Sequence, residues 1–227
     1  MKPKPSATFS NSFYSVRVTP LLLAIILHLI YLPDVFAARS LFVMEETRSG
    51  NLSFFPKWTG EMDRYSEQVG TPDSQCGKIK FYPCEVKEWK AFLQTLEHKP
   101  LRQQLEAVND YINQHPYIID QLNWGLNDYW ATPFEMMDVD GADCEDYAIS
   151  KFYSLRRLGV PGDQMRLMIV QDLNLGGIIH AVLGVYDGDD LLILDNQVTQ
   201  VMPALKIYHY RPIYSVNENS WWAYQPK

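Results

Sequence analysis

Cysteine is scarce in this chain, with three residues among 227. That number excludes a small scaffold held together mainly by several disulfides. Cys76 and Cys84 lie close together in CGKIKFYPC and could form a small disulfide loop in an oxidising compartment. Cys144 is then the odd thiol. It is either a buried apolar residue, the commoner fate of a single cysteine, or a reactive group.

Long hydrophobic runs are also few. The run LLLAIILHLIYL at 21–32 is shorter than the roughly 20 residues that a membrane-spanning helix needs. Basic residues precede it, and the small residues Val35 and Ala37 follow it, as in a secretory signal. We therefore predict a signal peptide over 1–37 and one domain over 38–227. An uncleaved inner-membrane anchor is the alternative.

The chain has no excess of basic residues, since 20 Lys and Arg stand against 27 Asp and Glu, giving a net charge of −7. An acidic surface argues against nucleic acid as a partner and suits a cation site. No internal repeat or low-complexity segment stands out either. With 47% hydrophobic residues, the remainder is typical of a single globular domain.

The hydrophobic patterns predict helices first and strands afterwards, the order of an α+β fold with helices packed on an antiparallel sheet. The predicted helices are 85–96, 101–114 and 144–158, and the predicted strands are 164–170, 178–186 and 191–194. Segment 39–75 shows no clear period and is expected to form loops and short segments. The aromatic stretch 121–133 is expected to be a loop whose rings cover the core.

The third predicted helix begins at Cys144, because Asp143 is a good N-cap residue and Gly159 and Pro161 terminate the pattern. A thiol in the first turn lies in the partial positive charge of the helix N-terminus. That position lowers the pKa of a thiol and favours the nucleophilic thiolate.

The hairpin between the last two predicted strands brings a histidine and an aspartate together. Asp-Gly between apolar runs predicts a two-residue turn at Gly188 and Asp189, which places Asp195 opposite Val182. His180 is then the diagonal neighbour of Asp195, at roughly 7–8 Å between backbones.

These positions suggest a cysteine nucleophile, a histidine base and an aspartate that orients the base: Cys144, His180 and Asp195. The alternative is structural. A lone histidine in a strand is usually a satisfied core residue, and an aspartate at a strand end is usually a turn residue.

Five carboxylates crowd around Cys144 in DVDGADCEDY, namely Asp138, Asp140, Asp143, Glu145 and Asp146. Their repulsion suggests a hard cation with oxygen ligands, and an irregular loop favours Ca²⁺ over Mg²⁺. The spacing is not that of an EF-hand. The alternative is a solvated acidic turn without a metal.

The block DCEDYAISKFYSLRRLGVP, with HAVLGV at His180 and LLILDNQ at Asp195, closely resembles the bacterial transglutaminase-like cysteine peptidases, and among them the LapG-type periplasmic proteases. The resemblance covers about 89–210. It implies a papain-like, transglutaminase-like core, and it carries the catalytic triad of the family onto Cys144, His180 and Asp195.

The resemblance also implies calcium dependence, with Asp143, Glu145 and Asp146 as the implicated acidic residues. Asp138 and Asp140 are added to this set on charge crowding alone. Cys76 and Cys84 have no counterpart that we can assign in the family pattern.

The resemblance further implies a biological role. The substrate would be a large cell-surface adhesin, cut in its N-terminal region in the periplasm so that cells leave a biofilm. The partner would be an inner-membrane receptor for cyclic dimeric GMP that sequesters the protease. Two alternatives stay open: an acyl-transfer enzyme of the same fold, and a non-catalytic calcium-binding interaction module.

Overall fold

The structure of the chain is a computed structural model that describes residues 44–226. The predicted signal peptide therefore lies outside the described residues. The α-helices are α2 (Pro56–Val69), α3 (Glu85–Gln94), α4 (Leu101–Ile112), α5 (Asp120–Asn123), α6 (Pro133–Val139) and α7 (Cys144–Arg157). The strands are β1 (Met44–Ser49), β2 (Met165–Asp172), β3 (Ile178–Asp187), β4 (Asp190–Leu194), β5 (Met202–Pro203), β6 (Tyr210–Val216) and β7 (Trp221–Pro226). Short 3₁₀ turns lie at Leu52–Phe54, Asp73–Gln75, Gly162–Gln164 and Ala204–Lys206.

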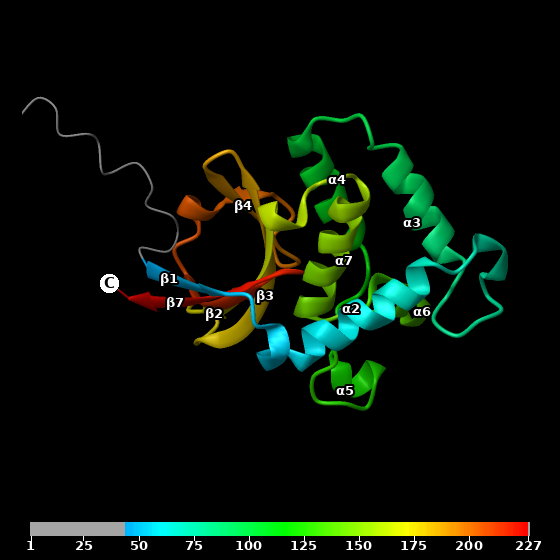
Figure 1. The fold of residues 1–227 in the computed structure, drawn as a ribbon, viewed down its shortest axis with the longest axis horizontal. Coiled ribbons are helices and arrows are strands. Elements are labelled where there is room, and N and C mark those ends of the chain that lie inside the picture. Colours follow the sequence, from blue (N-terminus) through cyan, green and yellow to red (C-terminus); the bar gives the residue numbers. More distant parts are fainter. Residues whose placement is uncertain (1–43, 227) are drawn as a thin grey trace, which may run out of the picture. The chain divides into compact units, whose positions relative to one another are not determined.

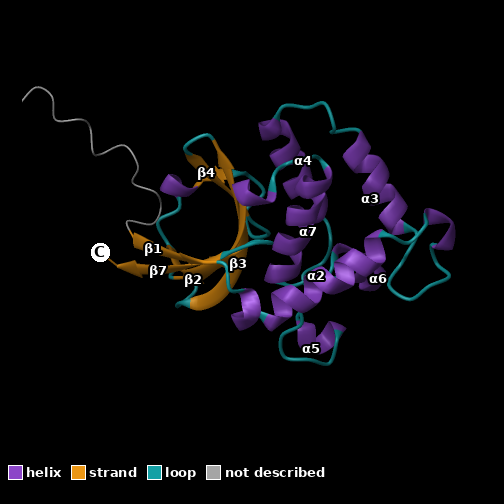
Figure 2. Cartoon of the chain, in the orientation of Figure 1, coloured by secondary structure: helices purple, strands orange, loops and turns teal. Residues whose placement is uncertain are grey.

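The strands form one antiparallel sheet in the order β1-β7-β6-β2-β3-β4-β5. The helices gather on one side of this curved sheet (Figure 1). Colouring by secondary structure separates the two layers clearly (Figure 2). The predicted α+β class, with helices packed on an antiparallel sheet, is confirmed.

Alternation of side chains along the central strands gives the sheet two apolar faces. On β3, Ala181 and Leu183 belong to the main core, which lies between the sheet and the helices. Val182 belongs to a second, smaller cluster, together with Tyr210 on β6 and Trp222 on β7. A sheet buried on both faces holds its strands, and any residue at their ends, in fixed positions.

Helix α7 is the element around which the helical layer packs. It contacts β3, β2, α4 and α6. Its residues from Asp146 to Leu155 are all buried. The Trp89 indole N–H on α3 donates to the Ser154 hydroxyl over 2.9 Å, and the Trp58 ring on α2 meets Phe152 edge to face. A helix enclosed in this way presents its first residue, Cys144, at a well-defined place.

The hairpin of β3 and β4 has the predicted register. Leu183 pairs with Leu194 and Asp187 pairs with Asp190, which leaves Gly188 and Asp189 as the turn. Gly188 adopts φ 61°, a left-handed conformation that glycine accepts without strain. The local geometry of this turn therefore fixes which residues of the two strands face each other.

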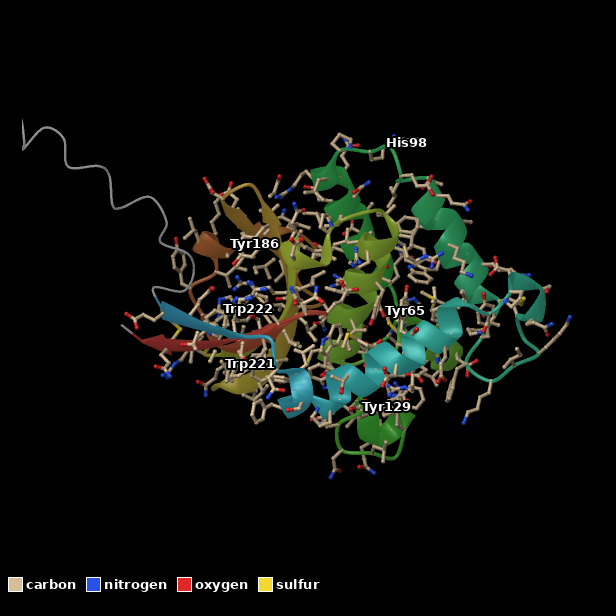
Figure 3. The ribbon with its side chains drawn as sticks, viewed as in Figure 1. Tyr65, His98, Tyr129, Tyr186, Trp221 and Trp222 are labelled. Carbon is tan, nitrogen blue, oxygen red and sulfur yellow. A yellow bond between two sulfur atoms is a disulfide. The ribbon has the colours of Figure 1, made fainter. Side chains whose placement is uncertain are left out.

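The interpretation of 39–75 as loops and short segments is wrong for most of the part that the structure describes. Residues 44–49 form edge strand β1, and α2 is a helix of 14 residues. Trp58, Met62 and Tyr65 do follow a helical spacing. The Tyr65 ring, labelled on α2 in Figure 3, stacks on Tyr153. The signal was obscured because Glu61, a charged residue, is fully buried on the same helix.

Four other elements were not predicted: α6, β5, β6 and β7. In the aromatic stretch, the short helix α5 occupies only 120–123, so the expectation of a loop over 121–133 holds for most of its length. Cys76 and Cys84, whose spacing left a disulfide open, do form one. No helix within 44–226 has the length and hydrophobicity needed to span a bilayer.

Candidate active site

Cys144 is the first residue of α7, as predicted. Asp143 is the N-cap residue in an extended conformation, and its backbone N–H points to the Asp146 carboxylate at 3.4 Å. Cys144 is half-buried and is the free cysteine. Its sulfur accepts a hydrogen bond from the backbone N–H of Ala181 on β3. The start of α7 therefore lies directly beside the residue that follows His180.

His180 and Asp195 form a buried pair. The His180 Nε2 lies 2.9 Å from the Asp195 Oδ1, and each residue is 2% exposed. The other ring nitrogen, Nδ1, faces the side-chain amide of Gln197 at 3.5 Å. The contact expected from the hairpin register is therefore made, and it leaves Nδ1 on the side away from the carboxylate.

Asp195 is anchored by further donors that sequence reasoning missed. The Tyr210 hydroxyl donates to its Oδ2 over 2.5 Å, and the Gln197 backbone N–H donates to its Oδ1 over 2.9 Å. Burial alone would raise the pKa of Asp195, but the hydrogen bonds from His180, Tyr210 and Gln197 outweigh burial and hold that pKa below its usual value. Asp195 is thus an ionised carboxylate in a fixed orientation.

The Cys144 thiol is not activated in the structure as it stands. Burial raises the pKa of Cys144 well above its usual value, and the Glu145 and Asp143 carboxylates raise it further. The thiol donates to the Glu145 Oε2 over 3.2 Å. The helix N-terminus is therefore insufficient by itself to produce a thiolate here.

Carboxylates from two segments converge beside Cys144. Ligand oxygens of Asp120, Asp143 and Asp146 lie within 4.8 Å of one another, and those of Asp120, Asp128 and Glu145 form a second such group. The structure thus brings together three of the predicted acidic residues and adds Asp120 and Asp128. No local pattern marks these two, because they reach the site only through the fold of 120–128.

This acidic cluster, defined as Asp120, Asp128, Asp143, Glu145 and Asp146, fits a hard cation. Burial raises the pKa of Asp120 to about 6 and, with the neighbouring carboxylates, raises the pKa of Asp143 and Asp146 well above the usual value. The Asp120 Oδ1 and the Asp143 Oδ1 have no hydrogen-bond partner in the described part of the chain. Buried oxygens that repel one another and lack donors are the ligands that Ca²⁺ or Mg²⁺ accepts.

Asp138 and Asp140 lie outside the acidic cluster. Asp138 is exposed near the end of α6. Asp140 adopts φ 47° at the C-cap of α6, and its carboxylate lies 3.0 Å from His115 Nδ1. Neither carboxylate therefore joins the other three predicted residues, although all five are close in sequence.

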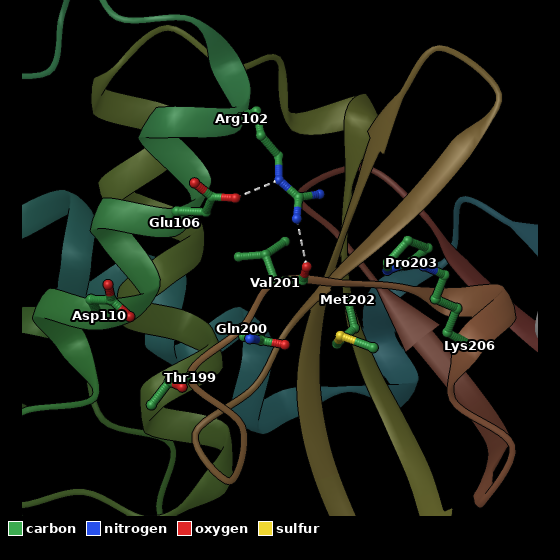
Figure 4. A pocket seen from close by; sticks show the side chains of 9 residues that line it. All are labelled: Arg102, Glu106, Asp110, Thr199, Gln200, Val201, Met202, Pro203 and Lys206. Atoms are coloured by element: carbon green, nitrogen blue, oxygen red, sulfur yellow. Dashed lines mark hydrogen bonds and ion pairs between the residues drawn. The ribbon is translucent and has the colours of Figure 1, made fainter.

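A pocket of about 560 Å³ lies between α4 and segment 199–206, where Arg102 bonds to Glu106 and to the Val201 carbonyl (Figure 4). Its lining has both charge signs. The described residues that line this pocket do not include Cys144, His180 or Asp195. A smaller pocket, of about 190 Å³, has aromatic walls that include Trp130, and it borders the acidic cluster at Asp128.

Residues 75–226 match the family model of the bacterial transglutaminase-like cysteine proteinases. The chain also resembles three solved structures of LapG from Legionella pneumophila at 32% identity over 72% of its length. The first covers 86% of the LapG chain with a TM-score of 0.56. For the calcium-bound form, 86% of the LapG chain is covered with a TM-score of 0.57. For the EGTA-treated form, 84% is covered with a TM-score of 0.56. No curated protein sequence matches the chain significantly.

Proposed function

Because this chain belongs to the bacterial transglutaminase-like cysteine proteinase family, we propose that it is a calcium-dependent cysteine endopeptidase whose catalytic residues are Cys144, His180 and Asp195. The observation that carries the assignment is the buried His180–Asp195 pair beside a thiol at the start of a helix. These are the nucleophile, the base and the orienting acid of a cysteine protease.

The reaction follows from these positions. The Cys144 sulfur attacks the carbonyl carbon of the scissile peptide, and its proton passes to His180. The imidazolium then gives that proton to the departing amine, which leaves a thioester on Cys144. Water, deprotonated by His180, hydrolyses the thioester and releases the acid product. Backbone N–H groups at the start of α7 would donate to the oxyanion.

Calcium would be held by the acidic cluster. A bound cation would supply positive charge that offsets the carboxylates opposing the Cys144 thiolate. The effect of the cation on the thiol would pass mainly through Glu145, because its carboxylate accepts the thiol hydrogen bond and also belongs to the acidic cluster. Support comes from the unpartnered oxygens of Asp120 and Asp143 and from the relatives solved with calcium and with EGTA.

The substrate that we propose is the N-terminal region of a large cell-surface adhesin, cleaved in the periplasm to release cells from a biofilm. An inner-membrane receptor for cyclic dimeric GMP would sequester the enzyme. This role is what the resemblance of the sequence to the LapG-type proteases implies, and the Cys76–Cys84 disulfide together with the secretory pattern at 1–37 supports an exported protein.

The test is cleavage of a purified N-terminal adhesin fragment from the same organism. The native protein should cleave it with calcium, and both a chelator and Cys144→Ala should abolish cleavage. Asp138→Asn is the matched control, because it removes an exposed carboxylate outside the acidic cluster. Cleavage that persists in Cys144→Ala would refute the nucleophile.

The same experiment separates the alternatives. An adduct with an added lysine-containing peptide, in place of hydrolysis, would identify acyl transfer. If the native protein cleaves nothing, and Cys144→Ser leaves partner binding and cell-level function unchanged, the chain is a calcium-binding interaction module.

A further inference from the structure

The segment between β4 and β5 carries Asp195 but belongs to no strand. The pairing of β4 with β3 ends at Leu194, and pairing resumes only with Met202 on β5. In the part of the chain that the structure describes, no backbone hydrogen bond joins 195–201 to another segment. Carbonyl groups outside a strand ladder need other donors, so the position of this segment depends on side chains.

Two asparagines of α4 supply such donors. The Asn113 amide, at the C-cap of the helix, donates to the Asp195 carbonyl over 2.8 Å. The Asn109 amide, one turn earlier, donates to the Thr199 carbonyl over 2.9 Å. The main chain of the catalytic aspartate is therefore tied directly to α4.

A third donor of α4 continues the same stripe. The Arg102 guanidinium donates to the Val201 carbonyl over 2.7 Å, as drawn in Figure 4. Arg102, Asn109 and Asn113 are seven and four positions apart, a spacing that places them on one side of a helix. This stripe of α4 therefore takes the place that a neighbouring strand would have along 195–201.

The two asparagines are poor choices for packing alone. Asn109 is 0% exposed, and the side-chain oxygens of Asn109 and Asn113 are buried without a hydrogen-bond partner in the region that the structure covers. A buried acceptor without a donor destabilises the fold. The use that each amide does have is its donation to a carbonyl of the segment after β4.

The same segment holds the His180 ring at both of its nitrogens. The Asp195 Oδ1 lies 2.9 Å from Nε2 and also accepts the Gln197 backbone N–H over 2.9 Å. The Gln197 side-chain amide faces Nδ1 at 3.5 Å. A displacement of 195–197 would therefore disturb both contacts of the ring at once, and the working geometry of a general base depends on such contacts.

We propose that Asn109 and Asn113 are positioning residues: they hold the segment after β4 so that Asp195 and Gln197 keep the His180 ring in its working orientation. This inference rests on the proposed function. Both asparagines act through the segment that they hold and touch neither the substrate nor the reacting atoms.

The experiment compares the native protein with Asn109→Ala and Asn113→Ala in the adhesin-fragment assay with calcium. We expect kcat to fall by roughly tenfold or more in each variant with little change in KM, because the base is less often correctly oriented. Gln104→Ala is the matched control. Gln104 is also a buried amide of α4, but it donates to the Leu96 carbonyl over 2.9 Å, so its loss should leave kcat at the native value.

A second readout does not depend on cleavage. In a Cys144→Ala background with calcium, NMR follows the exchange with water of the His180 Nε2 proton, which is bonded to the buried Asp195 carboxylate. Exchange should be at least about tenfold faster in Asn113→Ala and unchanged in Gln104→Ala, because local opening exposes the proton. If the native protein cleaves no adhesin fragment, the proposed function fails while this exchange rate still decides the inference.

Two outcomes would overturn the proposal. One is a native exchange rate of the His180 proton in both asparagine variants. The other is an equal loss of kcat and an equally fast exchange in Gln104→Ala, which would make a general weakening of α4 the cause. If Asn113→Ala does not fold, Asn113→Leu, which keeps the size of the side chain without its donor, is held to the same criteria.

Discussion

Removing calcium should destabilise the protein in a way that depends on pH. The acidic cluster contains Asp120, whose pKa burial raises to about 6, and Asp143, whose pKa is also raised. A carboxyl with a raised pKa in the folded state contributes stability below its unfolded pKa. That stability is lost as the pH rises through the folded pKa. Without a cation, stability should therefore fall from about pH 4 upwards.

The size of this loss of folding stability can be worked out from Asp120. A pKa of about 6 against an ordinary value near 3.9 corresponds to roughly 1–3 kcal/mol at pH 7 once solvent screening is allowed for. Asp143 adds to the loss in the same direction. Calcium at about 100 times its Kd would contribute about 2.7 kcal/mol to the folded state. For a domain of this size, the Tm with calcium should exceed the Tm with chelator by roughly 5–10 °C at neutral pH.

Thermal unfolding followed by circular dichroism tests this expectation with calcium and with chelator, near neutral pH and near pH 4.5. The gap should close at the lower pH, because protonated carboxyls neither repel one another nor bind calcium. Asp143→Asn should reduce the gap, and the exposed Asp138→Asn should preserve it. Equal Tm values with and without calcium at neutral pH would refute the cation site.

Other variants probe single contacts. Tyr210→Phe removes a hydrogen bond to the Asp195 carboxylate and should lower kcat/KM by about tenfold, measured by the adhesin-fragment assay, because bonds to charged groups contribute roughly 1.5–3 kcal/mol. Glu61→Gln should raise the Tm at neutral pH but not near pH 4, since burial raises the pKa of Glu61 and the acid costs stability only above its unfolded pKa. Replacing Cys76 and Cys84 by alanine should cost about 2–3 kcal/mol in chemical denaturation, because the disulfide closes a short loop. The value of kcat/KM should be retained, since neither cysteine belongs to the proposed catalytic residues or to the acidic cluster.

The contact between His180 and Asp195 could be predicted because it depends on local geometry. A two-residue turn fixes the register of a hairpin, and the register fixes the neighbours of every residue along it. The start of α7 at Cys144 could be predicted for the same reason, since capping and termination signals lie next to the helix in sequence.

The composition of the acidic cluster could not be predicted in the same way. Asp120 and Asp128 meet Glu145 only after the chain has folded through α6, and no periodicity connects these positions. Asp138 and Asp140 are nearer in sequence to Cys144, yet Asp138 is exposed on α6 and Asp140, in a left-handed conformation, contacts His115 instead. Charge crowding in the sequence therefore identified part of the carboxylate cluster but not all of its residues.

The most direct test of the central claim is the rate at which iodoacetamide alkylates Cys144, with the site of modification located by mass spectrometry. With calcium, at slightly acidic pH, the native protein should react at least about tenfold faster than the unfolded chain, because an activated thiolate persists below the ordinary thiol pKa. Chelator and His180→Ala should each remove that advantage. A Cys144 that reacts no faster than an unfolded thiol, or reacts equally fast in His180→Ala, would contradict the account.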